Sequence, residues 1–528
     1  MRMTNKIMQN NSLYNINNNK VLQDKLSTQM STQKKITRPS DDPVIAIRAL
    51  RLRSDVSTIS QYYEKNAPDA ESWLKVTGDA LNTTTQVLKD MKEQSTKGSV
   101  KDATTEDLDI ILTQLKALRD EYYSTGNVDY AGRYVFTGYR TDTTLTYTED
   151  TTQKFSITEQ INTDVIDTVN YTDIGDLKGL TKENFDSTTT EIKEQTVTSG
   201  DIYRIRLSYD KVSEGTKPTV TQVTDATTVP PTTAALIADG DIVMANDAAV
   251  TGAPYNGDYY EYAQKNPDKA VYVPETGELL IGTGLYDATF KTMDADKEIR
   301  VTYEKEDWVE GDLRPQHYFA CEDKGTGIKY NYTEDKNNPA NPSYISCEGE
   351  KQIMEYDVGY NQTIRVNTTA DEIYTANINR DVEDLESALN ALKEIDESRN
   401  NLDNMLKAAE EGTTEYDHIK ETYQAADKAY TYIRENMQKK YEGMITKVDN
   451  AIDTTSVGIT DNGTRSSRLD LISNRLMTQK TTFKTLQSEN EDADMTEVTV
   501  QLTSMEYSYQ SALLATGKIM QTSLMNYI

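Results

Sequence analysis

Apolar side chains recur at alternating intervals of four and three residues through the last thirty positions of the chain. On a helix these positions form one continuous seam, which Leu513, Met520 and Tyr527 widen at intervals of seven. The seam comprises Val498, Leu502, Met505, Tyr509, Ala512, Thr516, Ile519 and Ser523. No proline interrupts it, and the apolar pattern continues through Leu524. Because a single amphipathic helix is marginal in water, we expect it to pack against helices elsewhere in the chain or in neighbouring copies.

A first helix is predicted from about residue 8 to 35. Apolar residues lie seven apart and then four apart along it, at Ile7, Tyr14, Val21, Leu22, Leu26 and Met30. Asn and Gln dilute this pattern, so the helix is expected to be marginal in isolation.

A second helix is predicted to begin at a motif of polar residues and prolines that runs Arg38, Pro39, Ser40, Asp41, Asp42 and Pro43. Asp42 has the character of an N-cap, and Pro43 is pre-set for the first helical position. Asp41 adds negative charge at the positive end of the helix dipole. On these residues alone the motif predicts a good helix start and nothing further.

Two breaks are predicted in the helical parts of the chain. The apolar pattern resumes through Trp73 to Gly98, but Pro68 predicts a kink or break after Asn66. Nearer the C-terminus, the glycine-containing stretch Val457–Gly463 is predicted to be a turn between helices.

The middle of the chain has a different amino-acid composition from its two ends. From about residue 141 to 369, Thr, Tyr, Asp and Gly dominate, and short β-branched or aromatic runs alternate with turn residues. Pro274–Gly277, for example, separates two such runs and predicts a hairpin turn. The pattern therefore predicts an elongated α+β multidomain chain, with a coiled-coil core formed by the N- and C-terminal helices and with β-rich domains inserted between them.

Five segments follow from this pattern. We expect an N-terminal helix and a C-terminal helix, with two further helical parts and β-rich inserted domains between them. In chain order the five segments are residues 1–42, 43–139, 140–370, 371–463 and 464–528.

The charge of the chain is uneven along its length. The 528 residues carry a formal net charge of −30, but residues 1–65 carry +6 and residues 464–528 carry −1, so the interval between them carries −35. This balance argues against nucleic acid or an anionic membrane as a partner. With 36% hydrophobic residues, the chain is expected to form thin modules rather than thick cores.

Few residues of the chain are candidates for catalysis, metal binding or disulfide formation. The two cysteines, Cys321 and Cys347, are read as unpaired thiols, too few for a disulfide framework or a cysteine zinc site. The two histidines are far apart, and there is no zinc-protease motif or phosphate-binding loop. Asp294, Asp296 and Glu298 could hold a calcium ion, but a solvated turn is favoured because the glycine and full ligand set of a calcium loop are missing. We therefore expect no enzymatic activity, no cofactor and no metal. We also expect a chain without a membrane span or a cleaved signal, because no apolar run approaches about 20 residues.

Four stretches together resemble the flagellin superfamily, and within it the proteins of the junction between the flagellar hook and filament. Two lie in the N-terminal part, namely Arg38–Pro43 and the segment Ala131–Tyr139 with Asn127 before it. Two lie further along, namely Tyr356–Gly359 leading to Thr363–Asn367, and Ala512–Gln521 with Ser523, Leu524, Asn526 and Tyr527. The resemblance covers both helical ends and little of the middle, and Pro68 departs from the continuous helix that the family keeps.

This resemblance implies a flagellin-like fold and a structural subunit of the hook–filament junction. It also implies that residues 1–42 form an assembly helix that is disordered before polymerisation, that residues 464–528 form a C-terminal assembly helix, and that residues 43–139 and 371–463 are the helical parts of a rod domain. The partners it implies are copies of the chain in a ring-like layer, hook-associated protein 1 on the hook side, flagellin on the filament side and an export chaperone at the C-terminal helix. It also implies an extracellular flagellar location, reached without a cleaved signal peptide. The residues expected at the assembly interface are Ile7, Tyr14, Val21, Leu502, Met505, Tyr509, Leu513, Ile519, Met520, Leu524 and Tyr527.

Two other interpretations stay open. The chain could be flagellin itself, although Arg38–Pro43, Ala131–Tyr139 and the C-terminal ending resemble the junction proteins more closely. Alternatively, the middle could be an adhesive surface module, because 34 tyrosines supply polar aromatic contact surface. The simpler explanation of these tyrosines is that they replace phenylalanine in thin, half-wet β layers.

Overall fold

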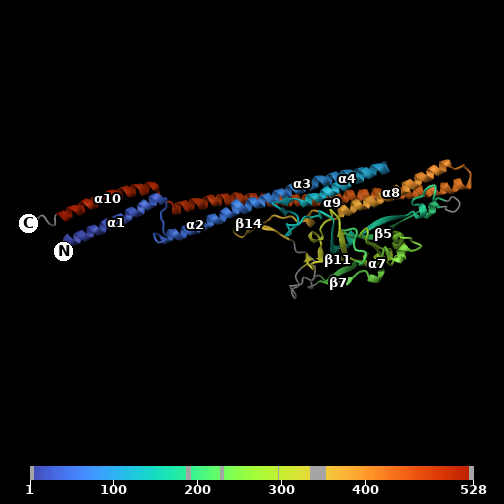
Figure 1. Cartoon of the computed structure of the whole chain (residues 1–528), viewed down its shortest axis with the longest axis horizontal. Helices are drawn as coiled ribbons and strands as arrows, with labels where there is room; N and C mark the ends of the chain where they lie inside the picture. Colours follow the sequence, from blue (N-terminus) through green and yellow to red (C-terminus); the bar gives the residue numbers. More distant parts are fainter. Residues whose placement is uncertain (1–4, 186–191, 226–230, 295–296, 333–351, 522–528) are drawn as a thin grey trace, which may run out of the picture. The chain divides into compact units, whose positions relative to one another are not determined.

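The computed structural model of the chain describes residues 5–185, 192–225, 231–294, 297–332 and 352–521. The protein is an α+β multidomain chain with long helices in both terminal parts and β-sheets between them (Figure 1). It divides into two compact units. The terminal unit comprises Met1–Glu71, Tyr356–Ile364 and Ser466–Ile528, and the central unit comprises Ser72–Glu355 and Arg365–Arg465.

The described α-helices differ widely in length. The long ones are α1 (Asn5–Thr32), α2 (Pro43–Gln61), α3 (Ala67–Gly98), α4 (Thr105–Ser124), α8 (Asn377–Ala408), α9 (Thr414–Glu491) and α10 (Met495–Gln521). Three short ones accompany the strands of the central unit, namely α5 (Ala248–Thr251), α6 (Tyr259–Lys265) and α7 (Thr283–Thr289).

In the terminal unit, α1 and α10 lie side by side and antiparallel, so the start of α1 and the end of α10 lie at the same end of the pair (Figure 1). The helix α2 runs beside the last part of α9. Contacts from Glu64 with Lys480 to Ile45 with Asn490 fix this antiparallel alignment. A small hairpin of β14 (Glu355–Gly359) and β15 (Gln362–Arg365) belongs mostly to this unit.

The chain does not leave the helical conformation at Pro68, so a break there is wrong, but the helix is irregular just before it. A π-helical turn, η1 (Tyr62–Asn66), joins α2 to α3 without leaving the helical conformation. Proline lacks a backbone N–H and cannot complete an α-helical hydrogen bond. A wider turn just before it, closed by the bond from the Ala67 N–H to the Tyr62 carbonyl, keeps the chain helical.

The helices of the central unit bury apolar rows at helical spacing. On α3 the row contains Leu74, Leu81, Leu88 and Met91, and on α8 it contains Leu385, Leu389, Leu392 and Leu402. These rows, with those of α4 and the first part of α9, form the core of the helical part of the unit.

The predicted turn at Val457–Gly463 is also wrong, because α9 continues through it. A Cβ at Gly458 would lie 2.4 Å from the Ile373 side chain, so the glycine allows close packing. Nearby, the buried side chain of Asn462 donates a hydrogen bond of 2.9 Å to the Leu74 carbonyl. These residue types, which usually favour turns, serve helix packing here.

One sheet of the central unit has six antiparallel strands. In spatial order they are β13 (Lys329–Tyr330), β12 (Ala320–Asp323), β3 (Thr151–Ile161), β11 (Ile299–Trp308), β6 (Thr219–Asp225) and β7 (Thr232–Ala235). Trp308 anchors its core, stacking on Tyr147 with 5.0 Å between ring centroids and meeting Phe155 and Tyr209 edge-on. Cys321 is a buried free thiol on β12, whereas Cys347 lies outside the described residues.

A second sheet has five strands. In spatial order they are β4 (Asp167–Asp173), β5 (Thr198–Arg206), β10 (Glu278–Ile281), β9 (Ala270–Val273) and β8 (Ile242–Met244). Only the β8–β9 pair is parallel within it. The predicted hairpin at Pro274–Gly277 is confirmed, since it joins β9 to β10 and Gly277 has a positive φ of 60°. A separate two-stranded ladder pairs β1 (Asp129–Tyr130) with β2 (Arg133–Tyr134).

Candidate functional site

The paired terminal helices are the first candidate site. The face of α10 that meets α1 carries Val498, Leu502, Met505, Tyr509, Ala512 and Thr516, the seam predicted from the sequence. The opposing face of α1 is largely polar. It contains Gln9, Ser12, Ile16, Asn19, Gln23 and Leu26, of which Ile16 and Leu26 are buried. The pair therefore buries or half-buries one apolar face of α10 but buries only two large apolar side chains of α1.

Both helices present a second, unburied apolar face. Tyr14 is 67% exposed and Val21 is 71% exposed on α1. On α10, Leu514 is 71% exposed and Tyr507 is 68% exposed. Other exposed apolar side chains on this pair are Ile7, Met8, Leu13, Leu22, Met30, Val500 and Leu513. Contiguous exposed apolar residues on a folded chain indicate a protein–protein contact surface.

The residues predicted for the assembly interface are divided between these faces. Ile7, Tyr14 and Val21 lie on the open face of α1, and Leu513 is exposed on α10. Leu502, Met505 and Tyr509 lie half-buried against α1. Leu524 and Tyr527 lie outside the described residues, and the side chains of Ile519 and Met520 are likewise outside them.

The connection between α1 and α2 (residues 33–42) is hydrogen-bonded to the connection between α9 and α10 (residues 492–494), and we call these two connections together the elbow. Residues 33–35 pair with residues 491–493, where the Lys35 N–H donates to the Glu491 carbonyl at 2.7 Å and the Ala493 N–H donates to the Gln33 carbonyl at 2.9 Å. These bonds link the α1–α2 connection to the α9–α10 connection. The end of α1 and the start of α10 are therefore held next to each other where they join the rest of the terminal unit.

A buried carboxylate holds this elbow. The Glu491 side chain accepts two hydrogen bonds from Arg53, at 2.7 Å from Nε and 2.5 Å from Nη2. Lys34 also lies 3.6 Å from Glu491 and pairs with Asp492. The hydrogen bonds from Arg53 keep the pKa of Glu491 below its usual range, so the pair stays charged at neutral pH.

The helix-start motif lies beside this elbow. Asp42 caps α2, accepting hydrogen bonds from the backbone of Val44 at 2.9 Å and Ile45 at 3.1 Å. Pro43 is the first residue of α2. Asp41 instead closes the preceding loop, because its carboxylate accepts the Arg38 N–H at 2.9 Å, and this bond lowers its pKa. Arg38 and Pro39 are exposed.

A third apolar face lies on α2. Ala46 and Ala49 are buried in the terminal unit, whereas Val44, Ile47 and Leu50 are exposed. The large apolar side chains of this helix therefore lie on its open side. The described part of the terminal unit exposes apolar stripes on α1, α2 and α10.

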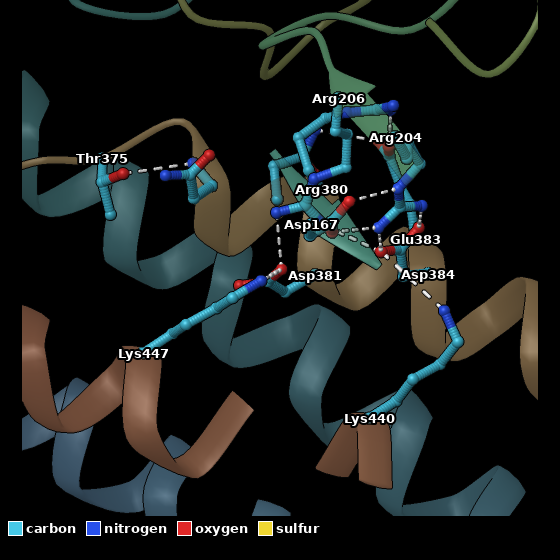
Figure 2. Close-up of polar contacts among 12 residues, drawn as sticks. Asp167, Arg204, Arg206, Thr375, Arg380, Asp381, Glu383, Asp384, Lys440 and Lys447 are labelled. Carbon is cyan, nitrogen blue, oxygen red and sulfur yellow. Dashed lines mark hydrogen bonds and ion pairs between the residues drawn. The ribbon is translucent and has the colours of Figure 1, made fainter. Parts of the chain in front are cut away.

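A second candidate site is a buried charge cluster in the central unit, which sequence reasoning missed (Figure 2). Arg204 on β5 forms paired hydrogen bonds with Asp167 on β4, at 3.0 and 2.7 Å, and with Asp384 on α8, at 3.1 and 2.9 Å. It also contacts Glu278 on β10. The neighbouring Arg206 reaches Asp384 at 2.8 Å.

The cluster extends to the long helix α9. Arg206 contacts Asp381 at 2.7 Å, and Lys447 on α9 donates to the same carboxylate at 2.6 Å. Lys440 on α9 lies 4.0 Å from Asp384. The five-stranded sheet is thereby connected to both helices by charges that are largely shielded from water.

The electrostatics of the cluster favour its charged form. Burial alone would raise the pKa of Asp384, but the positive charges of Arg204, Lys440 and Arg206 outweigh it and hold this pKa well below its usual range. Because removing one partner would leave a buried charge uncompensated, the cluster fixes the β-sheet on the helices. No periodic signal in the sequence marks these residues, since charges dispersed over 280 positions come together only in the fold.

Neither candidate site contains a catalytic constellation. No group of three or more metal-ligating side chains is found among the described residues. None of the described helices is both long and apolar enough to cross a membrane. His317 is largely buried, and burial lowers its pKa to about 4, so it is neutral at physiological pH.

Comparison with known proteins finds a family match at each end of the chain. Residues 3–141 match the bacterial flagellin N-terminal helical region, and residues 445–528 match the bacterial flagellin C-terminal helical region. The residues between these two regions lie outside both matches. They include both large sheets of the central unit.

Two relatives carry the same name. Flagellar hook-associated protein 3 of Salmonella typhimurium is 29% identical over 143 residues, and that of Escherichia coli K12 is 29% identical over 144 residues. Each match covers 27% of this chain and 45% of the relative, so it spans about half the length of these proteins. A crystal structure of flagellar hook-associated protein 3 from Legionella pneumophila is also similar at 12% identity, covering 83% of this chain and 98% of that one, with a TM-score of 0.30.

Proposed function

Because the chain carries the flagellin helical regions at both ends and resembles hook-associated protein 3, we propose that it is a structural subunit of the bacterial flagellum at the junction of hook and filament. In this proposal it is an adaptor and not an enzyme. Its location is extracellular, on the flagellum, after export without a cleaved signal peptide.

The observation that carries the proposal is the second apolar face of the terminal helices. The pairing of α1 with α10 leaves Tyr14, Val21 and Leu514 in water, and α2 leaves Ile47 exposed. Each such side chain gains about 1.5–3 kcal/mol when it is fully buried. Copies of the chain in a ring-like layer would bury these faces against one another.

The partners follow from the position of such a layer. Hook-associated protein 1 would meet it on the hook side, and flagellin would meet it on the filament side. Before export, a cytoplasmic chaperone would cover the apolar C-terminal helix, as grooves that bind amphipathic helices do. In this proposal each of the five segments predicted from the sequence has its own role, and residues 1–42 and 464–528 are the segments that serve assembly.

Substitutions on the open faces test the proposal. Val21→Glu and Leu514→Glu place charges on exposed apolar positions, so the free chain should fold normally while assembly at the junction is lost. As controls, Asn82→Glu on α3 and Gln114→Glu on α4 add the same charge to exposed polar positions of the central unit, away from the open apolar faces, and should preserve assembly. Removing the last twenty or so residues should likewise abolish assembly and leave the sheets of the central unit folded.

The location of the protein distinguishes a junction subunit from flagellin. Gold-labelled antibody against the chain should bind isolated flagella only at the boundary between hook and filament. Labelling along the whole filament would instead identify the chain as flagellin. A Val21→Glu, Leu514→Glu chain that still joins hook to filament would show that these faces do not serve assembly.

A further inference from the structure

A cavity of about 990 Å³ lies in the central unit, apart from the terminal helices. Its walls are the edge strand β4, the segment from Pro254 into α6, and the facing sides of α8 and α9. The buried charge cluster of Figure 2 forms part of its lining through Arg204, Asp384 and Lys440. The volume is at the upper end of the range of about 300–1,000 Å³ that is usual for small-ligand sites.

Tyrosine rings form one wall of this cavity. Tyr171 and Tyr260 stack with 5.4 Å between centroids and 10° between planes, and Tyr259 lies 4.9 Å from Tyr260. Tyr171 also donates a hydrogen bond to Asp258, which caps α6. The ring positions are therefore fixed before any ligand binds, which lowers the entropic cost of binding.

On the same lining, Lys440 makes no hydrogen bond to another described side chain or backbone group. Lys440 has one ion-pair partner among the described residues, the Asp384 carboxylate at 4.0 Å, which is beyond hydrogen-bond length. Its side chain is only 22% exposed, and burial lowers the pKa of its ammonium group. Unmade hydrogen bonds of buried donors cost free energy, and a ligand with acceptor oxygens would recover it.

The charged side chains of the lining restrict the net charge of a ligand that can bind in the cavity. Carboxylates outnumber cationic side chains around the cavity, and Asp173, Asp258 and Glu261 lie together at the tyrosine wall. Burial raises the pKa of Asp173, and the charges of Glu261 and Asp258 raise it further. An anionic ligand would be repelled there, and Lys440 on the same lining disfavours a ligand that is cationic along its whole length.

We propose that this cavity binds a short neutral oligosaccharide. A sugar ring offers an apolar C–H face that packs on a tyrosine ring, and its hydroxyls both donate and accept hydrogen bonds. Carboxylates such as Asp173 accept from these hydroxyls, while Lys440 donates to them. In a protein exposed outside the cell, such a site gives the inserted β-domain a binding activity separate from assembly.

A glycan array tests this inference directly. Labelled full-length chain is applied to immobilised neutral, sialylated and sulfated oligosaccharides. We expect retention on neutral oligosaccharides and none on the sialylated or sulfated ones. Absence of retention on every neutral oligosaccharide, or a preference for the anionic ones, would overturn the proposal.

Matched substitutions then locate the site. The Kd of a retained oligosaccharide is measured by titration calorimetry. Lys440→Met removes the donors and Tyr259→Ala removes a ring, so each should weaken binding about tenfold or more. Lys439→Met, on the exposed side of the same helix, and Tyr360→Ala, at an 89% exposed position in the terminal unit, should stay within about twofold.

Hydrogen exchange supplies a readout that needs no substitution. The bound oligosaccharide should slow exchange in residues 254–261, which line the cavity, and leave residues 151–161 of the six-stranded sheet unchanged. Normal binding by both cavity variants, or unchanged exchange at residues 254–261, would contradict the assignment of the site.

Discussion

At the scale of single residues, Asp384 shows how one side chain connects a sheet to two helices. It receives hydrogen bonds from Arg204 and Arg206 on β5 and faces Lys440 on α9. Its own side chain is 18% exposed. A charge in this environment is stabilised only by its partners, because water contributes little.

We predict that Asp384→Asn destabilises the central unit by about 3–5 kcal/mol, because it leaves buried cations without their shared counter-charge. Asp287→Asn is the matched control, since Asp287 forms an exposed pair with Lys291 at 2.8 Å and its loss should cost about 0.5 kcal/mol or less. Calorimetric unfolding of the full chain measures both. Equal effects of the two substitutions would show that the buried cluster does not hold the unit together.

The same residue predicts a pH dependence. The pKa of Asp384 in the folded chain is lower than its ordinary value of about 3.9. Its contribution is therefore fully present above that ordinary value and is lost as the pH falls towards the folded-state pKa. The stability difference between wild type and Asp384→Asn should stay constant from about pH 7 to 5 and shrink below about pH 4. A difference that widens on acidification would contradict the assigned charge state.

Local chemistry was predictable at this scale, and distant contacts were not. The N-cap at Asp42 and the hairpin at Gly277 follow from residue types that act within a few positions of the chain. Arg204, Glu278 and Asp384 carry no such local signal. They are distributed through a chain in which charged residues are common, and only the fold brings them together.

At the scale of elements, glycine had two different roles that the sequence does not distinguish. Gly412 has a positive φ of 88° and lies in the connection between α8 and α9, so a left-handed conformation explains it. Gly458 is helical, and its missing Cβ makes room for Ile373. A propensity-based prediction treats both as breaks, because packing by a distant residue leaves no trace near Gly458.

A pair of glycine substitutions on α9 tests this distinction. Gly458→Ala should destabilise the central unit by about 1–3 kcal/mol, because the added methyl group overpacks the contact with Ile373. Gly463→Ala has open space around its Cβ and should stabilise α9 by about 0.5–1 kcal/mol. Thermal unfolding gives both values. If both substitutions stabilise the chain, Gly458 is not a packing contact.

The helix α1 shows a further limit of hydrophobic patterns. The spacing of Ile7, Tyr14 and Val21 identified an apolar face correctly, but it could not show which face meets α10. The fold places Ser12, Ile16 and Asn19 there instead. A spacing of seven shows that residues share one face of a helix. It does not show which other helix that face contacts, because that depends on packing in the folded chain.

At the scale of the whole molecule, charge and apolar surface are separated along the chain. The interval from residue 66 to 463 carries −35, whereas the ends are basic or nearly neutral. Exposed apolar stripes are present on α1, α2 and α10 of the terminal unit. Helices with weak charge can approach one another in a layer, whereas like charges on the β-domains favour positions in water, where salt screens them.

Hydrogen exchange of free and assembled protein tests the central claim, that α1 and α10 are completed by neighbouring copies. We expect weak protection of Asn5–Thr32 and Met495–Gln521 in the free chain, strong protection of both after assembly, and no change in the two large sheets. Equal protection of these helices in the free and assembled states would contradict the claim.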